Sequence, residues 1–350
     1  MTDCLTHLAE YWGSDFEIVA LVGQRKDFDI PGVNFYELPN STFSPLAQSY
    51  YDYFGLRKLS RQLSPFLWLA FANSTQTVSA DRKAVYFQNA SPFYKLGVKE
   101  AFLSPRFALH RLLLGWIFRI NIETNTFVIV QQDWLRRKFS KWVDVKKIIV
   151  AHPEITPLSW KDTSGERDVN PAALYSFFYP SFPVVYKNFE VICQASEILV
   201  QKGITNFQVA LTLDRSVNRY ARSLVSRFST VPQLHFVGLL TRAEVYGYYR
   251  KSDCLLFPSK LESWGMPLIE FQALGKAMLV ADLPYACETL GAYPKAGYFN
   301  PSDPAGLAML MSQAVDGTLK FCERPVKPVD PPFAGNWHEL FETLLSTEAV

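Results

Sequence analysis

The sequence has few cysteines, and none of them is spaced for a metal site. They are Cys4, Cys193, Cys254, Cys287 and Cys322. Their number is odd and no C-x-x-C pair occurs, which argues against a disulfide framework and against a zinc site. Free thiols of this kind are typical of a reducing compartment, so we expect a cytoplasmic protein.

Long hydrophobic runs and blocks of charge are also lacking. No stretch reaches the ~20 apolar residues that a membrane-spanning helix needs. The N-terminus, which includes Asp3, has no apolar run of the kind found in signal peptides. Charged residues make up 19% of the chain and the formal net charge is only +2. The sequence therefore disfavours wholesale disorder and a nucleic-acid-binding arm.

What the sequence does contain is an alternation of short apolar runs with helical stretches. Of its 350 residues 49% are hydrophobic, enough for about two domains with sizeable cores. The run Glu17–Gly23 is nearly unbroken, and we expect it to be a strand buried on both faces. The alternation predicts an α/β fold with parallel sheets. Further strands are expected at Asn34–Leu38, Ala84–Asn89, Thr126–Gln131, Lys147–His152, Ala173–Tyr179, Phe207–Leu213, Leu234–Val237, Cys254–Phe257 and Ala277–Ala281.

A polar, irregular segment divides the chain. Pro153–Pro171 contains prolines, a glycine and several charges, which is typical of a linker. We therefore expect two Rossmann-like domains, at residues 1–160 and 171–325. Residues 326–350 are expected to form an extended, proline-rich stretch and a helix, Phe333–Leu345, that packs back on the N-terminal domain.

The residues that carry chemistry are concentrated between a predicted strand and a predicted helix, at Ser259–Glu270. Gly265 lets the backbone approach a ligand closely, and Pro267 is suited to the first turn of the helix. Free amides at such a helix start suit a diphosphate. Glu262 and Glu270 can both face one pocket, where carboxylates accept hydrogen bonds from paired sugar hydroxyls.

The spacing of Glu262 and Glu270, with Gly265 between them, resembles the E-x7-E motif of glycosyltransferase family 4. This family has the two-domain GT-B fold. The resemblance covers about residues 173–315 strongly and the N-terminal half weakly. Segments that follow the order of the family are Leu234–Gly238, Ser252–Ser259, Gly275–Ala281, Glu288–Gly291 and Tyr298–Asp303.

The resemblance implies a role for each site residue. Glu262 and Lys187 are implied to be catalytic, Glu262 contacting the donor sugar and Lys187 the diphosphate. Glu270 is implied to bind the ribose hydroxyls. Asn89 stands where relatives carry a histidine that touches the donor sugar. The other implied donor-binding residues are Ser263, Trp264, Gly265, Met266 and Gly238.

Two departures from the family keep other functions open. The loop around Lys187 lacks the usual arginine, and the chain begins at the helix that normally follows a first strand and a glycine-rich loop. A catalytically silent subunit that binds sugar nucleotides is one alternative. A GT-B epimerase or phosphorylase is another.

The resemblance implies retaining sugar transfer without a metal, from a UDP- or GDP-linked donor to a saccharide or lipid-linked saccharide, as in the synthesis of surface polysaccharides. Two segments, Leu56–Phe71 and Lys95–Arg119, combine basic and large apolar residues. Such segments can lie on an anionic membrane surface, which would suit a lipid-linked acceptor. Core helices with solvated basic faces are the alternative interpretation.

Overall fold

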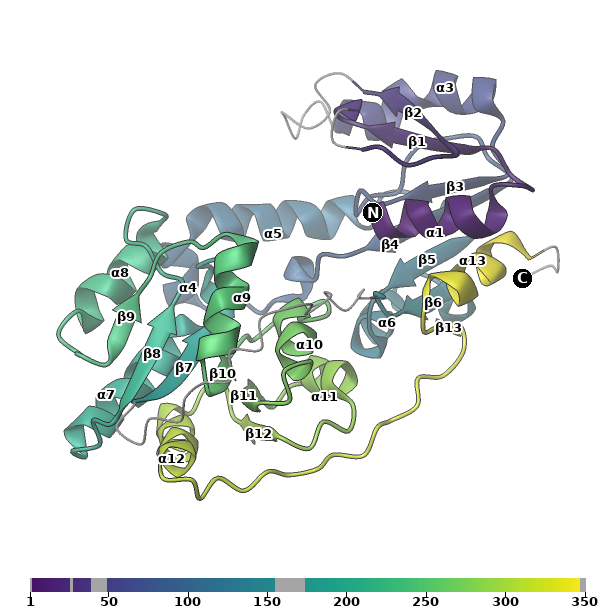
Figure 1. Cartoon of the computed structure of the whole chain (residues 1–350). Coiled ribbons are helices and arrows are strands. Elements are labelled where there is room, and N and C mark those ends of the chain that lie inside the picture. The colour runs from purple at the N-terminus through teal and green to yellow at the C-terminus, as the bar shows by residue number, and fades with distance from the viewer. Residues whose placement is uncertain (1, 26–27, 39–48, 155–173, 347–350) are drawn as a thin grey trace. The chain divides into compact units, whose positions relative to one another are not determined.

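In the computed structural model the chain forms two compact units (Figure 1). The structure describes residues 2–25, 28–38, 49–154 and 174–346, so most of the expected linker Pro153–Pro171 lies outside the described residues. The N-terminal unit comprises Met1–Asn89, Leu114–Ile155 and Val329–Val350. The C-terminal unit comprises Ala90–Leu113 and Thr156–Pro328.

The N-terminal unit is built on a five-stranded parallel sheet, ordered β13-β6-β5-β4-β3. The four residues of β5 and of β6 are all buried, as expected of inner strands covered on both faces. Two strands of this sheet, β3 and β13, were not expected. The four residues of β3 lie within a basic, apolar segment without a clear strand pattern, and Phe333 of β13 was expected to begin a helix. The strands are β3 (Leu67–Ala70), β4 (Arg82–Phe87), β5 (Phe127–Val130), β6 (Ile148–Ala151) and β13 (Phe333–Ala334).

A second, two-stranded parallel sheet of this unit contains β1 (Ile18–Val22) and β2 (Val33–Glu37). The prediction that the first strand is buried on both faces was wrong. Burial alternates along β1, since one of its faces packs on helix α1 (Thr2–Trp12), and within the described part of the chain β1 pairs with β2 alone. Leu5 of α1 packs with this small sheet, whereas Cys4 belongs to the core of the five-stranded sheet.

The C-terminal residues return to the N-terminal unit. Helix α13 (Trp337–Leu345) contributes Leu340, Phe341 and Leu344 to the core of the five-stranded sheet, next to α1. The helix begins four residues later than predicted, because the side chain of Asn336 accepts a hydrogen bond of 2.9 Å from the amide of Glu339 and caps it. Other helices with residues in this unit are η2 (Tyr51–Gly55), α3 (Leu56–Leu63), α5 (Pro105–Ile117), η4 (Ile122–Thr124), α6 (Asp133–Phe139) and η5 (Val145–Lys147).

The C-terminal unit contains a six-stranded parallel sheet, ordered β12-β11-β10-β7-β8-β9. The first three strands of the unit run outward from the middle in one direction, and the next three run outward in the other. The order therefore reverses between β7 and β10, where ligands bind in sheets of this kind. The strands are β7 (Tyr175–Tyr179), β8 (Phe207–Leu211), β9 (Leu234–Phe236), β10 (Cys254–Phe257), β11 (Ala277–Ala281) and β12 (Ala296–Phe299).

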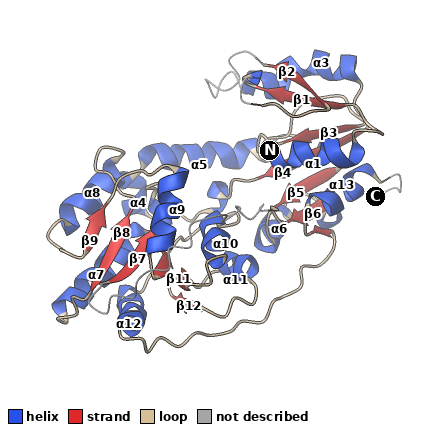
Figure 2. Cartoon of the chain, in the orientation of Figure 1, coloured by secondary structure: helices blue, strands red, loops and turns tan. Residues whose placement is uncertain are grey.

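Helices cover both faces of this sheet (Figure 2). Tyr179 contacts Phe189 of α7, whereas its neighbour Phe178 contacts Tyr248 and Tyr249 of α9. Successive strand residues point to opposite faces, so α7 and α9 lie on opposite sides. The remaining helices of the unit include α4, η6 and residues 105–113 of α5. Their bounds are α4 (Val98–Leu103), η6 (Val185–Lys187), α7 (Phe189–Gln201), α8 (Arg219–Phe228), α9 (Arg242–Lys251), α10 (Met266–Gln272), α11 (Pro284–Leu290) and α12 (Pro304–Val315).

Candidate functional site

The loops that follow β7 and β10 meet through an ion pair. Lys187 Nζ lies 2.6 Å from Glu262 Oε1. The two side chains are only 18% and 11% exposed, so the pair is largely shielded from water. Because β7 and β10 flank the reversal of strand order, the structure brings the two residues expected to be catalytic together at the ligand-binding end of the sheet.

Buried tyrosines surround this ion pair. Tyr179 is fully buried and donates a hydrogen bond of 2.9 Å to the carbonyl of Lys187. Tyr285 donates one of 2.7 Å to the carbonyl of Ser259, in the same loop as Glu262. Burial, followed by the charge of Glu262, raises the pKa of both tyrosines well above the ordinary value. Both hydroxyls therefore remain donors at neutral pH. Each one holds a loop by a backbone carbonyl, Tyr179 the loop after β7 and Tyr285 the loop after β10.

Side chains hold the loop that precedes α10 at several of its carbonyl groups. Asn188 donates 3.1 and 2.8 Å hydrogen bonds from its amide to the carbonyls of Pro258 and Pro301. The hydroxyl of Thr289 donates to the carbonyl of Trp264. These bonds hold the loop at its carbonyl groups, next to Ser263–Met266, the residues expected to contact a donor.

Gly265 occupies a backbone conformation that other residues rarely adopt. Its φ is +94°, in the left-handed region, and it lies directly before the first residue of α10. A Cβ at this position would also lie 3.3 Å from Leu268 Cδ1. The glycine is therefore needed for the turn from the loop into the helix.

Glu270 lies in α10 and faces α9 rather than open solvent. Tyr246 donates a hydrogen bond of 3.0 Å to Oε1, and Tyr249 donates one of 3.1 Å to Oε2. Sequence reasoning missed both tyrosines, because their spacing in α9 is that of core aromatics. Only the packing of α9 against α10 reveals their partner.

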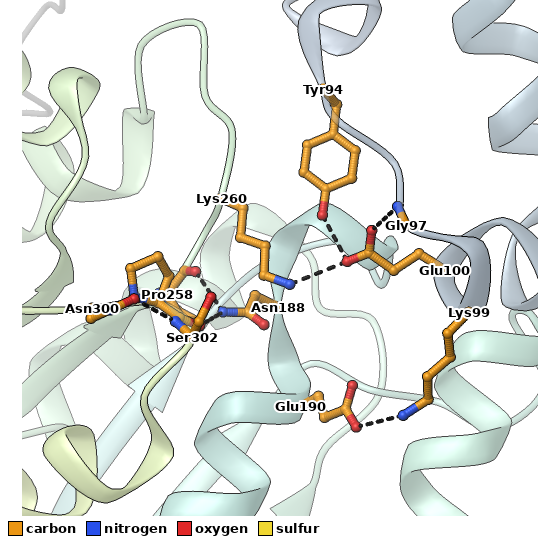
Figure 3. A network of polar contacts seen from close by, with 11 residues as sticks. Tyr94, Gly97, Lys99, Glu100, Asn188, Glu190, Pro258, Lys260, Asn300 and Ser302 are labelled. Atoms are coloured by element: carbon orange, nitrogen blue, oxygen red, sulfur yellow. Dashed lines mark hydrogen bonds and ion pairs between the residues drawn. The ribbon is translucent and has the colours of Figure 1, made fainter.

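The segment between β4 and α5 also contacts the loop that precedes α10, through Glu100 and Lys260 (Figure 3). Glu100 of α4 accepts a hydrogen bond of 2.8 Å from Tyr94 and pairs at 3.1 Å with Lys260, two residues before Glu262. The amide of Lys260 in turn donates a 2.7 Å bond to the carbonyl of Tyr186, next to Lys187. Sequence reasoning assigned no role to Glu100 or Lys260, since 160 residues separate them.

Two residues expected to bind the donor, Gly238 and Asn89, donate from their amides to residues other than Lys187, Glu262 and Glu270. Gly238 follows β9 at the edge of the sheet, so that β8 and β7 lie between its strand and β10. Its φ is +76° and its amide donates a hydrogen bond of 3.2 Å to the carbonyl of Leu213, which indicates a role in the turn of the backbone. Asn89 is the last residue of its segment of the N-terminal unit, and its amide donates to Asn73 Oδ1 at 2.9 Å.

Comparison with known families identifies the C-terminal unit. Residues 176–327 match the family model of group 1 glycosyl transferases. This segment contains both loops of the switch point and the whole E-x7-E motif. A comparison with curated protein sequences gives no match.

Solved structures resemble the chain over most of its length. Sucrose-phosphate synthase from Thermosynechococcus elongatus is 14% identical, with a TM-score of 0.64 over 90% of this chain and 83% of that one. The lipopolysaccharide glycosyltransferase WaaG is 14% identical, with a TM-score of 0.63 over 90% and 86%. HepE of Anabaena, in complex with UDP and glucose, is 12% identical, with a TM-score of 0.56 over 91% and 86%.

These matches define the class of the protein. The structural likeness, at such low identity, shows the GT-B fold of two α/β units. The family match shows that the C-terminal unit is a group 1 glycosyltransferase domain. The chain is therefore a glycosyltransferase, and the expected fold and enzyme class are confirmed.

Proposed function

We propose that the protein transfers a sugar from a nucleotide-sugar donor to a hydroxyl of a saccharide or lipid-linked saccharide, with retention at the anomeric carbon and without a metal ion. The observation that carries this proposal is the 2.6 Å contact between Lys187 and Glu262 at the switch point of a group 1 glycosyltransferase domain. A surface polysaccharide is the proposed product, because neighbours such as WaaG act in lipopolysaccharide biosynthesis.

Each residue of the candidate donor site has a proposed role. Lys187 neutralises the charge that develops on the diphosphate as the sugar leaves, which is the kind of electrostatic help that preorganised cations supply. Glu262 accepts hydrogen bonds from the donor sugar, and Glu270 accepts them from the ribose. The amides of Ser263–Met266 face the sugar and phosphates. A uridine nucleotide is favoured as donor, since HepE was solved with UDP and glucose.

The test is a thermal-shift screen against UDP, GDP, ADP and their sugars, followed by an assay of donor hydrolysis and transfer. A ligand at about 100 times its Kd stabilises the fold by ~2.7 kcal/mol. We expect one base to shift the melting temperature, and Glu262→Ala to abolish turnover of that donor. The absence of a shift with every nucleotide would overturn the donor site, and binding without any turnover would overturn the enzymatic role.

We further propose a peripheral contact with the inner face of the cytoplasmic membrane, through the apolar face of α5. Leu109, Leu112, Leu113 and Trp116 follow the i, i+3, i+4, i+7 spacing of one helix face and are 53–74% exposed. No carboxylate occurs between Glu100 and Glu123, whereas several arginines do, which favours an anionic lipid surface. Among the described residues, no helix has the length and apolar character that crossing a membrane requires.

The other basic segment does not support this contact. In Leu56–Phe71, Trp68 belongs to β3 and is only 9% exposed, so it is part of the core. Sedimentation with phosphatidylcholine vesicles, with and without phosphatidylglycerol, tests the α5 face. We expect Trp116→Ser to lower the bound fraction on anionic vesicles several-fold, and Met309→Ser, at an exposed position on α12, to leave it unchanged. Equal binding by all three proteins would overturn the proposal.

A further inference from the structure

The carboxylate of Glu270 is held at both oxygens by two tyrosines of α9. Tyr246 Oη lies 3.0 Å from Oε1 and Tyr249 Oη lies 3.1 Å from Oε2. An ionised carboxylate can accept about four hydrogen bonds. Two tyrosines occupy one acceptor position on each oxygen and leave one on each oxygen for a ligand. A pair of neighbouring hydroxyls matches that remaining pattern.

The ring of Tyr249 is held in one position by the side chains packed around it. It is fully buried, with its centroid 5.4 Å from that of Phe271, 5.8 Å from that of Phe178 and 5.8 Å from that of Tyr246. The position of its hydroxyl is therefore fixed. The hydrogen bond from this hydroxyl to Oε2 forms only when Glu270 adopts the matching side-chain rotamer, so Tyr249 selects that rotamer.

The hydroxyl of Tyr246 is oriented by a cation. Arg242 Nε donates to Tyr246 Oη at 3.0 Å, and the guanidinium carbon lies 5.6 Å from the ring centroid. Because that oxygen accepts a hydrogen bond from Arg242, the hydroxyl of Tyr246 donates its own hydrogen to Glu270. Burial, more than the charge of Glu270, raises the pKa of Tyr246 and of Tyr249, so both hydroxyls act as donors at neutral pH.

We propose that Tyr246 and Tyr249 are positioning residues that fix Glu270 to receive the vicinal 2′- and 3′-hydroxyls of a nucleoside diphosphate. The tyrosines do not touch the nucleotide. They set the angle at which the carboxylate meets the two hydroxyls, and Arg242 orients one of them. This inference rests on the proposed function, because it takes Glu270 to be the ribose-binding residue of the donor site.

The experiment compares ribonucleotides with their deoxy forms. Dissociation constants are measured by calorimetry for UDP, 2′-deoxy-UDP and 3′-deoxy-UDP, or for the base identified in the screen. The proteins are the full-length wild type, Tyr246→Phe, Tyr249→Phe and Glu270→Gln. Tyr248→Phe is the matched control, because Tyr248 is on the same helix but stacks on Phe178, with centroids 4.9 Å apart.

We expect the wild type to prefer the ribonucleotide at least tenfold. Each of Tyr246→Phe and Tyr249→Phe should weaken binding of the ribonucleotide about five- to tenfold and leave the affinity for the deoxy forms nearly unchanged, whereas Tyr248→Phe changes neither. In turnover, the donor KM should rise more than kcat falls. A general weakening toward all three nucleotides, or unchanged discrimination in both tyrosine variants, would overturn the positioning role.

The same data separate this inference from the function on which it rests. If the wild type binds no nucleoside diphosphate, the proposed function fails. If it binds and Glu270→Gln alone loses discrimination, the donor site stands and the tyrosine positioning fails. Melting temperatures of all variants show whether a loss of affinity reflects loss of the fold.

Discussion

Lys187 Nζ and Glu262 Oε1 are 2.6 Å apart, although 75 residues separate them in the sequence. Their loops follow β7 and β10, the two strands between which the order of the sheet reverses. A donor that binds at this point would meet a cation and a carboxylate that already neutralise each other. The pair therefore links two loops in the fold besides its proposed part in the chemistry, and the two roles can be measured separately.

The ion pair is expected to contribute to stability. In a double-mutant cycle of Lys187→Ala and Glu262→Ala, followed by urea denaturation, we expect a coupling free energy of about 1–3 kcal/mol, because both side chains are largely shielded. The control cycle uses Lys99 and Glu190, which are 3.4 Å apart with Lys99 74% exposed. An exposed pair of this kind should couple by less than ~1 kcal/mol. Equal coupling in the two cycles would contradict the prediction.

Gly265 is expected to be intolerant of a side chain. Gly265→Ala should lower the free energy of unfolding by about 1–2 kcal/mol, since alanine is strained at positive φ. The added Cβ would also press on Leu268 Cδ1 at 3.3 Å. Gly247→Ala is the matched control: this glycine lies inside α9 with no other atom within 4 Å of the added Cβ, so alanine should stabilise by about 0.5–1 kcal/mol. Chemical denaturation measures both, and a stable Gly265→Ala would refute the argument.

Asn188 connects the start of α7 to two other loops. Asn188→Ala removes both hydrogen bonds to the carbonyls of Pro258 and Pro301 and places alanine at φ +58°. We expect a loss of about 2–4 kcal/mol from the two causes together. Asn188→Gly removes the same hydrogen bonds without the strain, so it should be about 1 kcal/mol more stable than the alanine variant. If glycine and alanine are equally destabilising, strain at this position is negligible.

Asp52 makes the stability of the N-terminal unit depend on pH. It is 5% exposed and accepts hydrogen bonds of 2.7 Å from Ser74 and 2.8 Å from Gln76, while burial raises its pKa. A raised pKa means that the folded state binds the proton more tightly. The contribution of Asp52 is therefore favourable below the ordinary aspartate pKa of ~3.9 and is lost as pH rises through the folded value.

Asp52→Asn keeps a group of the same shape that can still accept from Gln76, and it can donate to Ser74. We expect this variant to melt at a higher temperature than the wild type at pH 7, with a difference that narrows as pH falls toward ~4. Thermal melts across this range measure it. Asp144→Asn, at an exposed position of the same unit, controls for the removal of charge. A lower melting temperature for Asp52→Asn at pH 7 would show that the ionised carboxylate is stabilising.

Local patterns were sufficient for most of the C-terminal unit. Apolar runs predicted β7, β10 and β11, because a strand covered on both faces must be apolar throughout. The capping box of α9 predicted its start, since Thr241 and Glu244 satisfy each other's backbone amides within one turn. Such signals are contained in a few neighbouring residues.

Elements that depend on distant partners were harder to predict. β3 has only four residues, and its strand character comes from pairing with β4. Phe333 was expected to begin a helix, but it pairs with Val150 of β6 and forms β13. A short extended segment gains its stability from the neighbouring strand, so its own composition carries little signal.

By itself the sequence determined the α/β class, the position of the E-x7-E loop and the glycine that begins α10, because these follow from periodicity, spacing and backbone sterics. Tertiary structure alone decided which side chains meet. It joined Lys187 to Glu262 through the reversal of strand order, and it set Tyr246 and Tyr249 against Glu270. The physical reason is that a hydrogen bond needs its atoms within about 3 Å, and only packing brings distant segments that close.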